Sequence, residues 1–151
     1  MKYPYPQLEN QGITDKKVLK AIRCLPRELF VAPELDKSAY INAPLPIDCG
    51  QTISQPYIVA YMTEQLELKP TNKVLEIGIG SGFQAGVLAQ LVQEVYTVEK
   101  HEKLSKQAQK ILTELGYKNV KYLISDGKEG WKEFAPFDAI IITALAKEKN
   151  N

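Results

Sequence analysis

Three glycines at alternate positions follow an apolar run in the middle of the chain. From Val74 the sequence reads Val-Leu-Glu-Ile-Gly-Ile-Gly-Ser-Gly, ending at Gly82. Glycines let the backbone turn tightly and approach a ligand where a Cβ atom would intrude. Glu99 ends the next apolar run, 17 residues after Gly82, where a carboxylate can accept hydrogen bonds from both hydroxyls of a ribose. The pattern predicts a nucleoside site formed by Gly78, Gly80, Ser81, Gly82 and Glu99.

The spacing of this loop bears on which nucleoside it holds. Dinucleotide-binding loops have the spacing G-x-G-x-x-G and rest a pyrophosphate on a helix N-terminus, whereas this loop has G-x-G-x-G. Glu76 lies two residues before the first glycine. We expect its carboxylate at the mouth of the site, where it repels pyrophosphate and attracts a cationic ligand. The pattern therefore favours S-adenosylmethionine over NAD. This prediction depends on the acidic residues, because a glycine loop alone can also be an ordinary turn.

A third loop, Ser125-Asp126-Gly127, follows another apolar run. We expect Asp126 to accept a hydrogen bond from the adenine amino group, with the backbone of Gly127 beside the ring. The alternative is an ordinary turn, because Asp-Gly is a common turn dipeptide. The adenine interpretation depends on this loop lying at the same edge of a sheet as the glycine loop and Glu99.

Groups that could activate a nucleophile or bind a metal are scarce. His101 is the only histidine, so the sequence predicts neither a metal site nor a Ser-His-Asp triad. A carboxylate acceptor is already anionic and needs no base. Residues 141–144 also lack the Asn/Asp-Pro-Pro-Tyr segment with which N-methylating enzymes handle exocyclic nitrogens. Methylation of a carboxyl oxygen is consistent with both absences.

Alternating strands and helices must position these loops. The apolar pattern predicts strands at about 73–78, 94–98, 120–125 and 137–143. It predicts helices over about 14–25 with Thr14 as cap, over about 57–68, after the glycine loop, and between the second and third strands. Prolines between Pro26 and Gln55 predict loops with short helical pieces. This order predicts an α/β fold with a doubly wound, mostly parallel, Rossmann-like sheet.

Composition fits a single enzyme domain with a substantial core, since 44% of the 151 residues are hydrophobic. A formal charge of +1 and only two arginines, Arg23 and Arg27, give no electrostatic reason to expect nucleic acid or membrane as partners. No apolar run reaches membrane-spanning length, and the N-terminus lacks the apolar core of a signal peptide. We interpret Cys24 and Cys49 as packing residues in a reducing compartment, with a disulfide as the alternative. We therefore expect a cytoplasmic protein.

The segment before these loops resembles a known family. Residues 43–47 read Ala-Pro-Leu-Pro-Ile and residues 50–57 read Gly-Gln-Thr-Ile-Ser-Gln-Pro-Tyr. This stretch closely resembles the signature of the protein-L-isoaspartate O-methyltransferases and is far more specific than the glycine loop. Residues 27–31, 74–84, 98–99, 125–127 and 137–141 resemble the same family. The resemblance runs from about residue 10 to residue 144.

The resemblance implies repair of aged proteins. Enzymes of this family use S-adenosylmethionine to methylate the free α-carboxylate of L-isoaspartyl residues, after which a succinimide re-forms and can reopen to normal aspartate. It implies isoaspartyl proteins and peptides as partners, and a monomer. The family's active-site serine corresponds to Ser54, and we place Thr52, Ile53 and Ser54 on the substrate side. We expect the Ser54 hydroxyl to orient the acceptor carboxylate; the alternative is a helix-capping box ahead of Pro56.

The resemblance also divides the chain and marks a departure. It implies one methyltransferase domain, in which residues 1–56 form a substrate-side segment, residues 57–144 the cofactor-binding core and residues 145–151 a polar tail. Family members continue past the fourth strand, where this sequence ends in Lys-Glu-Lys-Asn-Asn. We expect a sheet incomplete at its C-terminal edge, exposing Ile140, Ile141 and Ile142, and hence weak methyl transfer and self-association. The alternatives are a remnant that only binds the cofactor, and a methyltransferase with another carboxylate acceptor.

Overall fold

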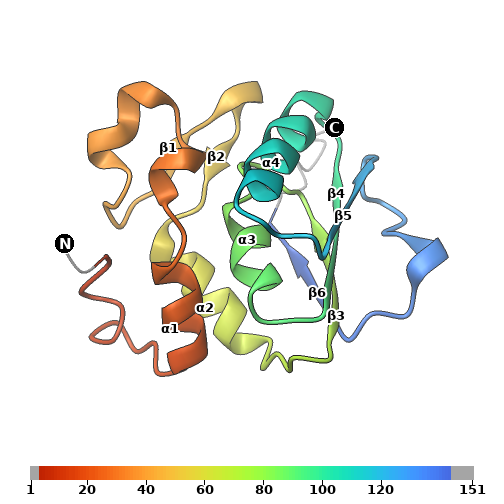
Figure 1. Ribbon diagram of the computed structural model, residues 1–151, viewed down its shortest axis with the longest axis horizontal. Coiled ribbons are helices and arrows are strands. Elements are labelled where there is room, and N and C mark those ends of the chain that lie inside the picture. The colour runs from red at the N-terminus through yellow and green to blue at the C-terminus, as the bar shows by residue number, and fades with distance from the viewer. Residues whose placement is uncertain (1–3, 144–151) are drawn as a thin grey trace, which may run out of the picture.

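A four-stranded parallel sheet forms the centre of the computed structural model, which describes residues 4–143 (Figure 1). Its strands are β3 (Lys73–Ile77), β4 (Glu94–Glu99), β5 (Val120–Ile124) and β6 (Ala139–Ile142). The α-helices are α1 (Lys16–Arg23), α2 (Pro56–Gln65), α3 (Phe83–Ala89) and α4 (Glu102–Glu114). The other described elements are the 3-10 helices η1 (Arg27–Phe30), η2 (Pro33–Ser38), η3 (Asp48–Gly50) and η4 (Lys132–Phe134), and the short strands β1 (Leu45–Pro46) and β2 (Thr52–Ile53).

The order of the strands determines where a ligand can bind. Across the sheet the order is β5-β4-β3-β6, and all neighbouring strands are parallel. The chain winds outward from β3 through β4 to β5, and then returns to place β6 on the other side of β3. In such sheets ligands bind beyond the carboxyl ends of the strands, where the winding reverses. Here that point lies between the ends of β3 and β6, next to the glycine loop.

Helices cover one face of the sheet (Figure 1), and an aromatic cluster covers part of the other. Helices α3 and α4 pack on the sheet, and α1 packs on α2 and α3. The connection from β5 to β6 crosses the opposite face, where Trp131, Phe134 and Phe137 surround the ring of Tyr96. The chain therefore crosses both faces of a parallel sheet, and the prediction of a doubly wound, Rossmann-like α/β fold is confirmed.

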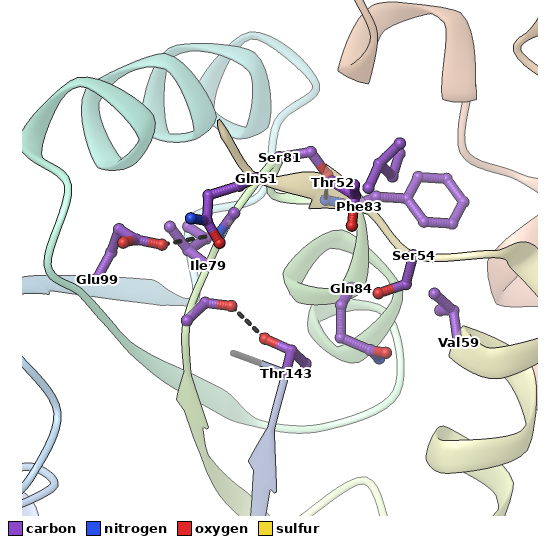
Figure 2. Close-up of a pocket in the computed structure, with 13 residues that line it drawn as sticks. Gln51, Thr52, Ser54, Val59, Ile79, Ser81, Phe83, Gln84, Glu99 and Thr143 are labelled. Carbon is purple, nitrogen blue, oxygen red and sulfur yellow. Dashed lines mark hydrogen bonds between the residues drawn. The ribbon is translucent and has the colours of Figure 1, made fainter. Parts of the chain in front are cut away.

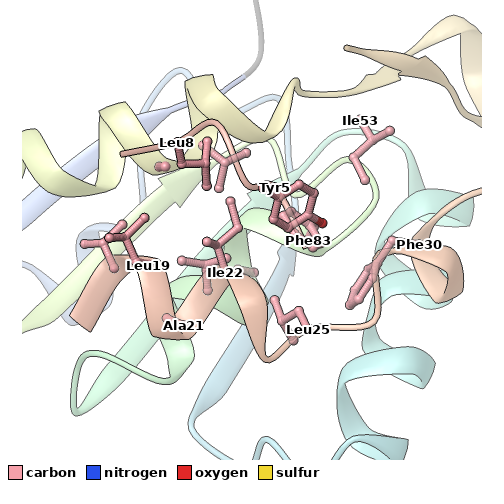
Figure 3. Close-up of a cluster of buried hydrophobic side chains, with 14 of the residues drawn as sticks. Tyr5, Leu8, Leu19, Ala21, Ile22, Leu25, Phe30, Ile53 and Phe83 are labelled. Carbon is pink, nitrogen blue, oxygen red and sulfur yellow. The ribbon is translucent and has the colours of Figure 1, made fainter. Parts of the chain in front are cut away.

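One hydrophobic cluster joins the N-terminal segment to the helices on the sheet (Figure 3). Leu25 after α1, Ile53 of β2 and Phe83 of α3 are all fully buried in it. The rings of Phe30 and Phe83 meet edge to face, with centroids 5.5 Å apart. Burying side chains of this size contributes about 1.5–3 kcal/mol each. This packing fixes the strand β2 and the residues after it in front of the glycine loop.

The first helix starts later than expected, so the prediction of Thr14 as its cap is wrong. Helix α1 is capped by Asp15, whose carboxylate accepts hydrogen bonds from the N–H groups of Lys17 and Val18. The backbone N–H of Thr14 instead donates to Glu64 of α2 at 2.8 Å. The N–H of Asp15 donates to the same carboxylate at 2.9 Å, so Glu64 holds the residues that precede α1.

Two expectations about burial are also wrong. Cys24 and Cys49 are exposed free thiols and not packing residues. In β6, Ile141 faces the helices and is 2% exposed, whereas Ile140 and Ile142 face the other side and are 55% and 62% exposed. Because side chains alternate along a strand, two of the three isoleucines reach solvent and the middle one does not.

None of the helices within residues 4–143 is long and apolar enough to span a membrane. The polar tail expected at residues 145–151 lies outside the described residues.

Candidate functional site

A pocket opens where the winding of the sheet reverses (Figure 2). Its empty volume, including the part open to solvent, is about 460 Å³. The end of β2, the glycine loop, the first turn of α3 and the ends of β4 and β6 meet around it. The lining residues are Gln51, Thr52, Ile53, Ser54, Val59, Gly78, Ile79, Gly80, Ser81, Phe83, Gln84, Glu99 and Thr143. The structure therefore brings the predicted substrate-side residues together with Gly78, Gly80, Ser81 and Glu99.

The carboxylate of Glu99 fixes the glycine loop at the end of β4. Its Oε1 accepts the N–H of Gly80 at 3.0 Å, and its Oε2 accepts the N–H of His101 at 2.9 Å. Because each carboxylate oxygen has two lone-pair positions, one acceptor position on each oxygen is left for a ligand. The two backbone contacts hold the carboxylate in one orientation, as a bidentate contact to a ribose requires.

The glycine at position 82 is required by helix packing. Gly82 has a φ of +93°, and a Cβ atom there would lie 2.8 Å from the Cβ of Ala108 in α4. It is absent from the residues that line the pocket. The close approach of α3 to α4 thus accounts for this glycine, and its contact with a ligand stays a prediction.

Glu76 lies beneath the pocket, so the prediction that it lies at the mouth is wrong. Its side chain is 0% exposed and points to the helix-covered face, level with Thr97 of β4. Oε1 accepts a hydrogen bond from the Thr97 hydroxyl at 2.7 Å, and Oε2 is buried without a hydrogen-bond partner among the described residues. Burial raises the pKa of Glu76 to about 8; the Thr97 hydrogen bond opposes this rise and the nearby charge of Glu99 adds to it. At neutral pH this carboxyl is therefore mostly protonated and does not attract a cation as an anion would.

The Thr-Ile-Ser stretch forms β2 and one wall of the pocket. Ile53 points into the core and is 2% exposed, and Ser54 follows it with its hydroxyl directed into the pocket (Figure 2). Helix α2 begins at Pro56 with Gln55 as its N-cap, and no side chain caps it. The helix-capping alternative for this stretch is therefore wrong, and the Ser54 hydroxyl is placed for contact with a ligand.

The Ser-Asp-Gly loop lies beside Glu99 but outside the residues that line this pocket. The N–H of Ser125 donates to the carbonyl of Glu99 at 3.0 Å. Asp126 is exposed, and its Oδ1 accepts the N–H of Lys128 at 3.0 Å, which is a turn. A Cβ atom on Gly127 would lie 2.8 Å from Cγ2 of Ile77. The structure shows the turn, and the adenine contacts of both residues stay predictions.

Sequence reasoning missed three polar residues of the pocket, which are Gln51, Gln84 and Thr143. Gln84, 7% exposed, donates to the hydroxyl of Thr63 at 2.9 Å. Thr143 follows β6, and its hydroxyl donates to the carbonyls of Ile77 and Gly78. Gln84 could have been found, because it is a polar residue inside an otherwise apolar helix. The place of Thr143 at the pocket could not, because it follows from the pairing of β6 with β3. No group of three or more His, Cys, Asp or Glu side chains within residues 4–143 is arranged to hold a metal ion.

Comparisons with known sequences point to one family. A family model described as protein-L-isoaspartate(D-aspartate) O-methyltransferase matches residues 5–150. The protein-L-isoaspartate O-methyltransferase of Picosynechococcus sp. is 54% identical over 138 residues, which cover 91% of this chain and 62% of that protein. The enzyme of the same name from Dictyoglomus turgidum is 53% identical over 144 residues, which cover 95% of this chain and 66% of that protein. The chain thus spans less than two thirds of the length of these relatives.

Two solved structures are similar over nearly the whole chain. A protein-L-isoaspartate O-methyltransferase superposes with a TM-score of 0.79 at 32% identity, covering 90% of this chain and 45% of that one. A second structure, titled as a putative protein-L-isoaspartate O-methyltransferase from Plasmodium falciparum in complex with S-adenosyl-L-homocysteine, has a TM-score of 0.76 at 25% identity. This match covers 94% of this chain and 72% of that one.

Proposed function

Because the chain belongs to the protein-L-isoaspartate(D-aspartate) O-methyltransferase family, we propose that it transfers the methyl group of S-adenosylmethionine to L-isoaspartyl residues of damaged proteins. The acceptor is their free α-carboxylate. The observation that carries this proposal is the meeting of two motifs at one pocket, Thr52–Ser54 on one wall and the glycine loop with Glu99 on the other. Direct transfer between two bound molecules needs both held within reach of each other.

The cofactor half of the pocket fits a nucleoside with a polar chain. Glu99 offers two oriented acceptor oxygens for the ribose hydroxyls, and the backbone from Gly78 to Ser81 forms the adjoining surface. We assign the adenine to Asp126 and Gly127, since their loop is hydrogen-bonded to the end of β4. When bound, S-adenosylmethionine supplies an electrophilic methyl group on a sulfonium.

The acceptor half needs a group that orients an anion and no group that removes a proton. An isoaspartyl carboxylate would attack the methyl carbon with one of its own oxygen lone pairs while the bond from sulfur to the methyl group breaks and S-adenosyl-L-homocysteine leaves, so no base is required. The Ser54 hydroxyl donates a hydrogen bond to the other carboxylate oxygen and holds the acceptor in line. This division of roles agrees with a pocket in which the described residues supply hydroxyls and amides, and no histidine, on the acceptor wall.

The same proposal covers the organisation and surroundings of the chain. Residues 1–56 provide the acceptor wall and residues 57–144 provide the cofactor-binding core. Isoaspartyl proteins and peptides are the partners. We propose a cytoplasmic location, because exposed free thiols such as Cys24 and Cys49 persist in reducing compartments.

Calorimetry tests the cofactor half directly. Titration with S-adenosyl-L-homocysteine should show one binding site, and titration with NAD should show none. Binding of NAD in place of the nucleoside thioether would overturn the cofactor assignment. Methyl transfer to an isoaspartyl peptide and to its normal aspartyl twin then tests the acceptor half.

A further inference from the structure

A buried arginine lies directly behind the acceptor wall. Arg27, in η1, is 0% exposed. Its Nη1 donates to the carbonyls of Ala39 at 2.6 Å and Ile41 at 3.1 Å. Its Nη2 donates to the carbonyls of Ala43 at 2.9 Å and Ser54 at 3.1 Å. One guanidinium therefore ties the loop of residues 39–43 to the residue that carries the proposed acceptor hydroxyl.

The positive charge of this guanidinium has no acidic partner. None of the ion pairs among the described residues includes Arg27, and its Nε is buried without a hydrogen-bond partner there. Burial lowers the pKa of Arg27 from its ordinary value, but arginine stays protonated in proteins. Burying an unpaired charge is costly. The four carbonyls stabilise this cation, the nearby Tyr5 opposes the fall of its pKa, and its field extends beyond these groups.

Ser54 lies between the guanidinium of Arg27 and the pocket. The Ser54 carbonyl faces Arg27, whereas its hydroxyl faces the pocket (Figure 2). On the opposite side of the pocket stands the carboxylate of Glu99. The pocket thus lies between a buried cation behind the acceptor wall and an anion on the cofactor side.

We propose that Arg27 is a positioning residue for the acceptor, because its guanidinium holds Ser54 from behind and its unpaired charge favours a carboxylate at the acceptor wall. This inference rests on the proposed function, since it presupposes an anionic acceptor. It assigns a role in acceptor recognition to a residue that does not touch the acceptor. It also explains how an anion can be favoured where the pocket itself has no basic side chain among its lining residues.

The alternative is a purely structural arginine, and the chain offers a matched control for it. Arg23 of α1 also binds backbone carbonyls, those of Pro4 at 3.0 Å and Tyr5 at 2.9 Å. It is paired with Glu9 and does not line the pocket. Arg23→Met therefore removes a carbonyl-binding arginine without changing the charge behind Ser54.

The test compares peptide affinities in saturating S-adenosyl-L-homocysteine. The probes are a fluorescent isoaspartyl peptide with a free α-carboxylate and its α-carboxamide twin. In the unmodified protein the carboxylate peptide should bind more tightly. Arg27→Met should lower this preference about tenfold, which corresponds to about 1.4 kcal/mol. Arg23→Met should leave the preference nearly unchanged, and neither variant should change the affinity for S-adenosyl-L-homocysteine much.

Arg27→Lys keeps the charge but cannot hold four carbonyls, and it serves if Arg27→Met does not fold. It should retain the preference for the carboxylate, bind both peptides several-fold more weakly and speed amide hydrogen exchange at residues 52–54. An unchanged preference in Arg27→Met, or unchanged peptide affinities in Arg27→Lys, would overturn the inference alone. If the unmodified protein itself shows no preference for the carboxylate peptide, the proposed function fails together with it.

Discussion

Glu76 and Glu99 lie on neighbouring strands, and their surroundings give the two side chains different tasks. Glu99 is at the end of β4, where two backbone N–H groups orient its oxygens toward the pocket. Glu76 is inside the sheet layer, with one hydrogen bond and one unpartnered oxygen. A carboxyl that is buried in this way favours its neutral form. Only Glu99 can therefore serve as an ionic contact to a ligand.

The burial of Glu76 predicts a pH dependence of stability. Its folded pKa of about 8 exceeds the value of about 4.3 expected in the unfolded chain. The folded state therefore binds the proton more tightly than the unfolded chain does. The resulting contribution to the free energy of unfolding is full below the unfolded pKa and is lost as the pH rises through the folded pKa. Glutamine cannot titrate, so the melting temperature of Glu76→Gln should fall less than that of the unmodified protein as the pH rises from the unfolded pKa to the folded pKa.

The matched variant is Thr97→Val, which removes the hydrogen bond that lowers the pKa of Glu76. It should move the fall in stability to higher pH, as measured by thermal unfolding. If the melting temperatures of the unmodified protein, Glu76→Gln and Thr97→Val change with pH in the same way, Glu76 is not a buried, protonated carboxyl.

Ser54 is expected to affect methyl transfer and not cofactor binding. Ser54→Ala removes the hydroxyl that faces the acceptor, so kcat/KM for an isoaspartyl peptide should fall about tenfold or more, the range of a hydrogen bond to a charged group. The Kd of S-adenosyl-L-homocysteine should stay within about twofold, because the backbone at this position is held by Arg27. Ser105→Ala, a buried serine of α4 outside the pocket, is the control. Equal losses of transfer and of cofactor affinity would assign Ser54 a structural role.

At the scale of elements, the packing of α3 on α4 fixes the end of the glycine loop. Gly82 and Gly116 have nearly equal φ values of +93° and +92°, but a Cβ atom meets Ala108 only at position 82. Gly116→Ala should therefore cost about 1–2 kcal/mol for the left-handed backbone alone. Gly82→Ala should cost a further ~1–3 kcal/mol for overpacking. Denaturant unfolding measures both, and equal losses would show that the contact with α4 is unimportant.

The sequence predicted the elements better than it predicted which residues face the pocket. Apolar runs were enough to locate β3, β4, β5 and β6. The central residues of β3 and β4 are buried on both faces, as expected of strands with continuous apolar runs. Such runs do not show the register between strands, so the buried position of Glu76 and the place of Thr143 were not predictable. The role of Arg27 could not be predicted either, because the carbonyls that accept its hydrogen bonds are up to 27 residues away in the sequence.

At the scale of the whole molecule, β6 is one of the two edge strands of the described sheet, and β5 is the other. Strand β6 pairs with β3 and has no second partner within residues 4–143. Ile140 and Ile142 are exposed on it, and an apolar edge strand is a template for pairing with another chain. We therefore predict concentration-dependent self-association, measured by analytical ultracentrifugation.

The double variant Ile140→Thr/Ile142→Thr should reduce this association and leave binding of S-adenosyl-L-homocysteine unchanged. Ile41→Thr, which changes an exposed isoleucine far from the sheet edge in sequence, should leave association as it is. A strictly monomeric unmodified protein, or equal effects of both changes, would show that β6 is not the contact surface.

The central claim is that one pocket brings the methyl donor to an isoaspartyl carboxylate. The most direct measurement is transfer of a labelled methyl group from S-adenosylmethionine to an isoaspartyl peptide and, in parallel, to the aspartyl peptide of the same sequence. We predict base-labile methyl ester on the isoaspartyl peptide alone, suppressed by S-adenosyl-L-homocysteine and reduced in Ser54→Ala. Equal labelling of both peptides, or no labelling of either by a chain that binds S-adenosyl-L-homocysteine, would contradict the claim.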